Sequence, residues 1–164
     1  MSFDGTSLPM PSLPRGYFAV GAERISKSLN LGNIMRSGHA FGASFTFTIG
    51  ASYQALEARA DTSKGQWHLP HYNWRGIEEM ALPQGCLLVG VELTDDAVDL
   101  PRFRHPSRAA YVLGPERGSL SPELLAKCDK VVRIPTRFCV NVAIAAAIVM
   151  YDRVQSASVA PRLP

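Results

Sequence analysis

Short apolar runs recur along the chain from residue 17 onward, separated by amphipathic or polar stretches. Most of these runs are continuous and rich in Val, Leu, Ala and aromatic residues, as in strands covered on both faces of a parallel sheet. The run Phe45-Thr46-Phe47-Thr48-Ile49 instead alternates apolar and polar residues, which also indicates a strand. We therefore predict strands at residues 17–20, 45–49, 87–91, 109–113 and 130–134.

Helical patterns separate these strands. We predict helices at 33–41, at 74–82, from Ser121 onward, and at 140–154. Ser121 is a suitable N-cap residue, and the proline after it suits the first helical position. Residues 60–75 mix polar and aromatic side chains without a regular period, so we predict a long loop there. Strands that alternate with helices predict an α/β domain with a mainly parallel sheet and helices on both faces.

Length and composition predict one folded unit. At roughly 150 residues per domain, a chain of 164 residues makes one domain. Apolar residues make up 46% and charged residues 19%, which allows a packed core and argues against general disorder. We expect an N-terminal tail at 1–15, the domain at 16–155 and a C-terminal tail at 156–164. The formal net charge of +3 permits an anionic partner such as RNA without requiring one.

Several classes of protein are excluded by what the chain lacks. The longest apolar stretch, 139–151, contains Asn141 and is too short to span a membrane. The N-terminus has no basic start followed by an apolar block, so we predict no secretory signal. The three cysteines, Cys86, Cys128 and Cys139, are widely spaced, which argues against both a disulfide framework and a zinc cluster. We therefore expect a soluble cytoplasmic protein without a membrane partner or a metal.

The common nucleotide and hydrolase signatures are absent as well. The chain has no G-x-G-x-x-G, no G-x-x-x-x-G-K-[ST] and no G-x-S-x-G sequence, which argues against dinucleotide oxidoreductases, P-loop enzymes and α/β-hydrolases. His68 and His71 lie three residues apart without a nearby third ligand. Contact with solvent or RNA is therefore a better reading of this pair than metal binding.

Three segments carry a family resemblance when they are taken together. They are NLGNIMRSGHAFG at 30–42, LGPERGSLS at 113–121 and IPTRFCVNVA at 134–143. In order and spacing they resemble the three motifs of the SpoU/TrmH branch of the SPOUT methyltransferases. The resemblance extends over nearly all of residues 17–154.

The resemblance implies a specific activity and architecture. Members of this family transfer a methyl group from S-adenosylmethionine to a ribose 2′-hydroxyl of RNA. They work as homodimers, and their C-terminal chain forms a deep trefoil knot that builds the cofactor pocket. A chain of this size resembles the tRNA wobble-position enzymes more than the rRNA enzymes. This resemblance therefore favours tRNA over rRNA as the substrate.

A cofactor site follows from the resemblance. An S-adenosylmethionine pocket needs apolar walls and main-chain groups that can bond the adenine edge. The positions that match are Leu93, Gly114, Glu116, Gly118, Ile134, Pro135, Cys139 and Val140. Alternatives stay open for some of them: the glycines can simply turn the chain, Glu116 can be a solvated surface acid, and Val140 can belong to the core.

Arg36 is the main candidate for catalysis, with Asn30, Cys139 and Asn141 as further members of the catalytic site that the resemblance implies. Arg36 follows Asn30 by six positions, which is the spacing of the family's motif residues. Guanidinium stays protonated in proteins, so we expect Arg36 to clamp a phosphate and the ribose oxygen instead of acting as a general base. Asn30 either orients this site or caps the following helix.

The third motif departs from the family pattern. Cys139 stands where the family usually has serine, and the stretch from Ile134 to Asn141 is shorter than is common. Cys139 either presents a small polarisable group to the site or is a buried structural thiol.

RNA contacts are expected from basic and aromatic residues. Arg36, Lys64, His68 and Arg75 are our candidates, since cationic and aromatic side chains bind phosphates and stack on exposed bases. The loop that holds the last three can equally pack against a partner subunit. Two alternative functions remain open: methylation of rRNA, and a noncatalytic RNA-binding or assembly protein that retains the knotted fold.

Overall fold

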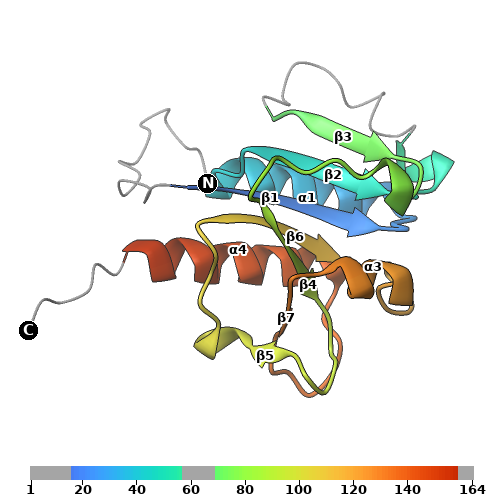
Figure 1. Cartoon of the computed structure of the whole chain (residues 1–164). Helices are drawn as coiled ribbons and strands as arrows, with labels where there is room; N and C mark the ends of the chain where they lie inside the picture. The colour runs from blue at the N-terminus through green and yellow to red at the C-terminus, as the bar shows by residue number, and fades with distance from the viewer. Residues whose placement is uncertain (1–15, 57–68, 159–164) are drawn as a thin grey trace, which may run out of the picture.

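Parallel strands form the centre of the structure, a computed structural model that describes residues 16–56 and 69–158. The strands are β1 (Tyr17–Glu23), β2 (Phe45–Ile49), β3 (His71–Trp74), β4 (Leu87–Val91), β5 (Val98–Asp99), β6 (Arg108–Leu113) and β7 (Lys130–Arg133). They make one seven-stranded sheet in the order β3-β2-β1-β6-β4-β7-β5 (Figure 1). Every pairing is parallel, which confirms the predicted α/β class with a parallel sheet.

Helices cover both faces of this sheet. Helix α1 (Ser28–Phe41) and helix α4 (Val142–Ser158) pack against each other on one face, and the short helix α3 (Pro122–Lys127) lies on the other. Ser121 caps α3 as expected, because its hydroxyl accepts a hydrogen bond from the Leu124 N–H at 3.2 Å. None of the helices among the described residues is both long enough and apolar enough to cross a membrane.

The central strands alternate their side chains between two cores. In β1, Phe18, Val20 and Ala22 pack in the cluster that includes α1 and α4, whereas Ala19 faces the cluster that includes α3. Strand β6 divides in the same way, and both strands are buried along nearly their whole length. Burial on both faces explains why their sequences are continuously apolar.

Strand β3 corrects the prediction of a loop over 60–75, of which residues 60–68 lie outside the described part. A hydrogen bond of 2.8 Å joins the Thr46 hydroxyl to the His71 ring, and the Thr48 hydroxyl donates to Asn73 at 2.9 Å. The rings of Phe45 and Tyr72 also meet edge to face. These cross-strand contacts with β2 stabilise a strand that its own sequence does not indicate.

The predicted helix at 74–82 is also wrong. Trp74 is buried as the last residue of β3, and only Ile77–Glu79 form a short 3-10 turn. The Glu79 carboxylate accepts hydrogen bonds from the Arg75 main-chain N–H at 2.9 Å and from its guanidinium at 2.6 Å. Trp74, the first residue of the predicted helix, pairs with β2 as part of β3. A tight turn follows it in place of the helix.

Other boundaries differ by a few residues. Helix α1 starts at Ser28, earlier than the predicted residue 33, and β1 continues to Glu23. Helix α4 starts at Val142 and runs to Ser158, so residues 156–158 are helical where we expected a tail. Its start is explained by the Asn141 side chain, which accepts hydrogen bonds from the first free N–H groups of the helix. The expected tail at 1–15 lies outside the described residues.

Candidate functional site

A pocket opens at the carboxyl ends of β4, β6 and β7. In open parallel sheets this edge is the usual place for ligands. Three chain segments that follow these strands line it, and it contains these residues of the predicted cofactor site: Leu93, Gly114, Glu116, Gly118, Ile134, Cys139 and Val140. Pro135 is not among the residues that line this strand-end pocket. The fold therefore brings together residues that lie far apart in the sequence.

The loop from Gly114 to Gly118, the glycine loop, forms one wall of this pocket. Gly118 has a φ of +102°, a conformation that residues with a Cβ atom rarely adopt. A Cβ atom on Gly114 would lie 3.1 Å from the main-chain nitrogen of Leu120. The backbone conformation therefore favours glycine at position 118, and at position 114 a side chain would crowd the Leu120 main chain.

Glu116 holds the glycine loop against the start of α1. Its carboxylate accepts hydrogen bonds from the Ser26 N–H at 3.0 Å, the Ser26 hydroxyl at 2.9 Å and the Lys27 N–H at 2.8 Å. Burial by itself would raise the pKa of Glu116, but hydrogen bonds from main-chain N–H groups and from Asn30 outweigh it and lower the pKa to about 2. The carboxylate is thus a structural anchor, and the alternative of a solvated surface acid is wrong.

A chain of side-chain hydrogen bonds connects the three sequence motifs. The Asn30 amide group donates to Glu116 at 3.2 Å, and the Asn30 side-chain oxygen accepts from Asn141 at 3.0 Å. Asn30 is only 6% exposed and lies inside α1, whose N-cap position is Lys27. The alternative that Asn30 caps the helix is therefore wrong, and Asn30 instead links the glycine loop to the start of α4.

The structure also decides the alternatives for the third motif. Cys139 is exposed and lines the strand-end pocket, so it is not a buried structural thiol. Val140 lines the same pocket and is 38% exposed, so it does not belong to the core. Both residues are available to a ligand.

Arg36 lies elsewhere. It is exposed on α1 and lines a second depression between α1 and α4, which we call the helix groove, together with Asn30 and Asn141. Arg36 does not line the strand-end pocket of its own chain. The two sites share a border, because Asn30 contacts Glu116 of the pocket and also lines the groove.

Comparison with known proteins identifies the family. A family model described as the SpoU rRNA Methylase family matches residues 17–151. The chain belongs to the SpoU methylase family. This confirms the resemblance that the three sequence motifs carry.

Individual relatives can also be compared with this SpoU protein. It is 30% identical over 145 residues to mouse tRNA (guanosine(18)-2'-O)-methyltransferase TARBP1, an alignment that covers 81% of this chain and 9% of the mouse protein. The SpoU methyltransferase AviRb from Streptomyces viridochromogenes, solved in complex with AdoMet, is 25% identical with a TM-score of 0.74. That match covers 92% of this chain and 61% of AviRb.

A smaller solved relative matches over nearly its whole length. It comes from a structure reported as giving insights into the 2-OH methylation of C/U34 on tRNA. The match covers 87% of this chain and 99% of that one, with 20% identity and a TM-score of 0.67. At this identity the likeness concerns the fold.

Two of the candidate RNA-binding residues, Arg36 and Arg75, are in the described part of the chain, and neither lines the strand-end pocket. Arg75 follows the edge strand β3, whereas the pocket lies at β4, β6 and β7, and its guanidinium forms an ion pair with Glu79. Lys64 and His68 lie outside the described residues.

Two polar residues that line the pocket, Glu92 and Thr136, are not among those predicted from the sequence. Glu92 directly follows the apolar strand β4. A charged residue at that position is a signal that could have pointed to the ligand-binding edge of the sheet.

Proposed function

We propose that this SpoU protein is an S-adenosylmethionine-dependent methyltransferase that methylates a ribose 2′-hydroxyl of RNA, with tRNA as its substrate. One observation carries the proposal: the strand-end pocket is built from two of the three motif segments, and the hydrogen-bond chain from Glu116 through Asn30 to Asn141 joins it to the third. Family membership supports RNA methylation as the chemistry.

The pocket residues suit S-adenosylmethionine. Leu93, Ile134 and Val140 would provide the apolar walls around adenine, and the glycine loop would offer main-chain groups to its edge. Gly114 adds no side chain to that wall, where its backbone passes close to the Leu120 main chain. When bound, the cofactor supplies a methyl group activated by a positively charged sulfur. The AdoMet complex of AviRb supports this choice of cofactor.

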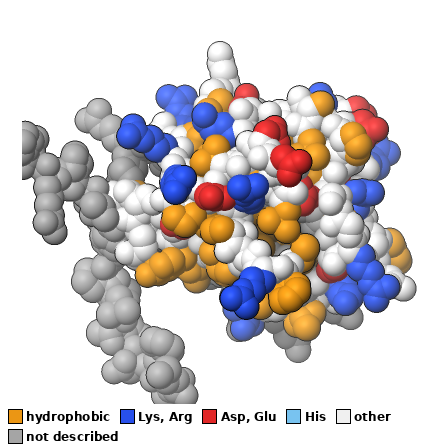
Figure 2. Space-filling model, turned by 90° about the horizontal axis from the view of Figure 1, so that it is seen from below, with side chains coloured by type: hydrophobic (Ala, Val, Ile, Leu, Met, Phe, Trp, Pro, Cys, Tyr) orange, Lys and Arg blue, Asp and Glu red, His pale blue; other side chains and the backbone are white. Residues whose placement is uncertain are grey.

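Arg36 would act on the RNA. Its guanidinium remains protonated, so it would bind a phosphate and the target ribose oxygen and stabilise the charge that develops as the hydroxyl loses its proton. On the face shown in Figure 2, Lys and Arg side chains are dispersed among hydrophobic and acidic ones instead of forming one continuous patch. Arg36 is therefore the cation on which this proposal relies, and no basic patch of this face is part of it.

The separation of Arg36 from the pocket supports a site built by two chains. The helix groove exposes three large apolar side chains, Leu29, Ile144 and Tyr151, at 73%, 55% and 56%. A second copy that packs on this groove would cover them and place Arg36 at the boundary between subunits. We include a homodimer in the proposal, and light scattering that shows a fully active monomer at micromolar concentration would overturn this part.

The choice of tRNA has narrower support. The names of the mouse relative and of the C/U34 structure both refer to tRNA. Another solved structure, an AdoMet-bound rRNA methyltransferase from Sinorhizobium meliloti, is 24% identical with a TM-score of 0.75, so rRNA remains the alternative substrate. The trefoil knot implied by the family resemblance is also part of the proposal.

Transfer of a tritiated methyl group to bulk tRNA and to rRNA tests the function directly. We expect label in tRNA at the 2′-oxygen of one nucleotide, identified by digestion and mass spectrometry. Label in rRNA alone would contradict the proposal that tRNA is the substrate. Binding of both cofactor and RNA without any transfer would favour a noncatalytic RNA-binding protein.

The Arg36→Ala variant tests the mechanism. Loss of one charge-stabilising donor typically lowers the rate by about 10²–10³. We expect that loss in single-turnover transfer at saturating RNA, with S-adenosylmethionine affinity nearly unchanged, and little rescue by Arg36→Lys. Arg102→Ala is the matched control, because Arg102 is exposed and lines neither the strand-end pocket nor the helix groove. A single-turnover rate above about half of the wild-type value would exclude Arg36 from catalysis. A loss of less than about twofold is far smaller than the loss of about 10²–10³ expected for a charge-stabilising donor.

A further inference from the structure

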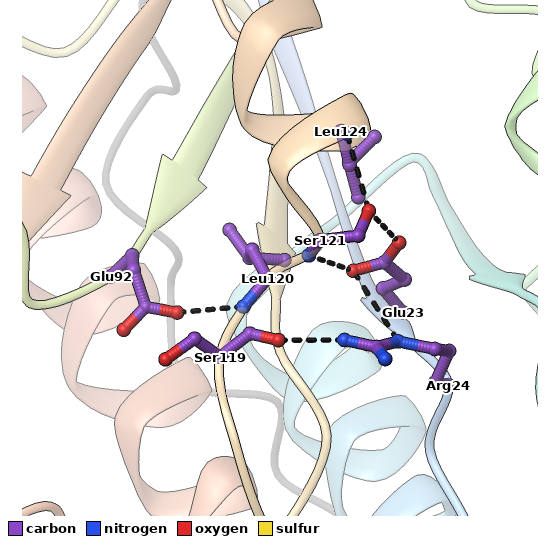
Figure 3. Close-up of polar contacts among 7 residues, drawn as sticks. All are labelled: Glu23, Arg24, Glu92, Ser119, Leu120, Ser121 and Leu124. Atoms are coloured by element: carbon purple, nitrogen blue, oxygen red, sulfur yellow. Dashed lines mark hydrogen bonds and ion pairs between the residues drawn. The ribbon is translucent and has the colours of Figure 1, made fainter.

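The segment 119–121, which we call the loop stem, leaves the glycine loop and leads into α3. Side chains from the ends of two strands hold it (Figure 3). Glu92 follows β4, and Glu23 and Arg24 lie at the end of β1. All three point toward the stem, so each of its residues is bonded to a different side chain.

Glu92 connects two walls of the strand-end pocket. One of its carboxylate oxygens accepts a hydrogen bond from the Leu120 N–H at 2.8 Å, and the other accepts from the Leu93 N–H at 2.9 Å. Leu93 lines the pocket, and so does Glu92 itself. The Leu120 nitrogen is the atom that a Cβ on Gly114 would approach to 3.1 Å. Glu92 therefore holds in place the Leu120 main chain, against which Gly114 of the glycine loop packs.

Glu23 and Arg24 bind the same stem differently. Glu23 is 3% exposed and accepts hydrogen bonds from the Ser121 N–H at 2.7 Å and the Ser121 hydroxyl at 2.5 Å. Arg24 donates from its guanidinium to the Ser119 carbonyl at 2.8 Å and has a φ of +52°. A left-handed conformation at a residue other than glycine persists only where surrounding contacts enforce it.

We propose that Glu92 is a positioning residue for the cofactor: its carboxylate sets the spacing between Leu93 and the glycine loop. The inference rests on the proposed function, because it takes the occupant of the pocket to be S-adenosylmethionine. Affinity then depends on a wall that is held in place before the cofactor binds.

The hydrogen-bond chemistry of Glu92 and Glu23 leads to different expectations for the same substitution. Both partners of Glu92 are main-chain N–H donors. Glutamine has one carbonyl oxygen, so its amide group would face a second donor and one bond would be lost. Glu23 has one N–H partner and one hydroxyl partner, and a hydroxyl can also accept. Glutamine at position 23 can therefore keep both bonds.

The experiment compares Glu92→Gln with Glu23→Gln, and with Glu123→Gln as a control on the exposed side of α3. S-adenosylmethionine binding is measured by isothermal titration calorimetry, and KM and kcat by methyl transfer. We expect Glu92→Gln to raise the Kd and the KM for the cofactor about tenfold, the effect of losing one hydrogen bond to a charged group. We expect kcat at saturating cofactor and RNA affinity near wild type. The other two variants should bind within about twofold of wild type, since glutamine at position 23 can keep both bonds to Ser121 and Glu123 is exposed on α3 away from the pocket.

Each other result overturns the inference. A merely structural role would lower the melting temperature of Glu92→Gln and leave the Kd of the folded protein unchanged. Equal weakening in Glu23→Gln would show that negative charge matters and that the N–H partners do not. If Glu92→Gln does not fold, hydrogen exchange of the wild-type Leu120 amide decides: we expect the cofactor to slow it, and an unchanged rate overturns the inference. Failure of wild type to bind the cofactor would instead refute the proposed function.

Discussion

Replacing Glu116 by glutamine tests whether the carboxylate anchors the glycine loop. Glutamine has nearly the same shape but only one carbonyl oxygen, whereas the carboxylate accepts hydrogen bonds from Ser26, Lys27 and Asn30. If the glutamine oxygen faces Lys27, the Ser26 N–H loses its bond of 3.0 Å and keeps only the longer one of 3.3 Å. We expect lower stability at neutral pH and weaker binding of S-adenosylmethionine.

The pKa of Glu116 sets the size of the stability loss expected for Glu116→Gln. Its lowering from 4.5 to about 2 means that folding favours the ionised form. At about 1.4 kcal/mol per pKa unit the upper limit is about 3 kcal/mol, and screening by solvent at this partly exposed group reduces it to about 1–2 kcal/mol. Because the pKa is lower in the folded state, this stabilisation is complete above about pH 4.5 and is lost as the pH falls toward about 2.

Urea denaturation of both proteins between pH 7 and pH 3 measures the effect. The free energy of unfolding of Glu116→Gln should be lower than that of wild type by about 1–2 kcal/mol at pH 7, and the gap should narrow below about pH 4.5. Glu123→Gln is the control, since an exposed carboxylate in the first turn of α3 contributes only a few tenths of a kcal/mol. Equal stability at pH 7, or a gap that does not change with pH, would refute the reasoning.

Three further substitutions have expected outcomes. Cys139→Ser should change stability by less than about 0.5 kcal/mol and leave cofactor affinity within about threefold, because Cys139 is exposed; a melting curve and a calorimetric titration check this. Gly118→Ala should weaken cofactor binding and cost about 1–3 kcal/mol of stability in urea denaturation, since φ is +102° there; an unaffected variant would contradict the requirement for glycine. Arg153→Lys should lower the free energy of unfolding by about 2–3 kcal/mol. The Arg153 guanidinium donates to the carbonyls of Pro106, Ser107 and Tyr17, and an ammonium group cannot reach all three. Retention of wild-type stability in urea denaturation would argue against this bridging role.

The sequence by itself determined the class of fold, and its motifs pointed to seven of the residues that line the strand-end pocket. The apolar runs marked β1, β4 and β6, because strands buried on both faces are apolar along most of their length. The motif glycines were singled out through the family resemblance, and the positive φ of Gly118 gives a local physical reason for glycine there. These are local constraints, and a local constraint leaves a local pattern.

Only the tertiary structure decided which residues act together. Asn30 and Asn141 are hydrogen-bonded across a sequence separation of 111 residues, and Ser121 reaches Glu23 across 98. No periodicity records such a pairing, because each partner is an ordinary polar residue in its own segment. Strand β3 and the short turn after it likewise depend on β2 as a neighbour. Glu92 was overlooked for the same reason: a carboxylate at a strand end becomes a positioning residue only where another segment presents its N–H groups to it.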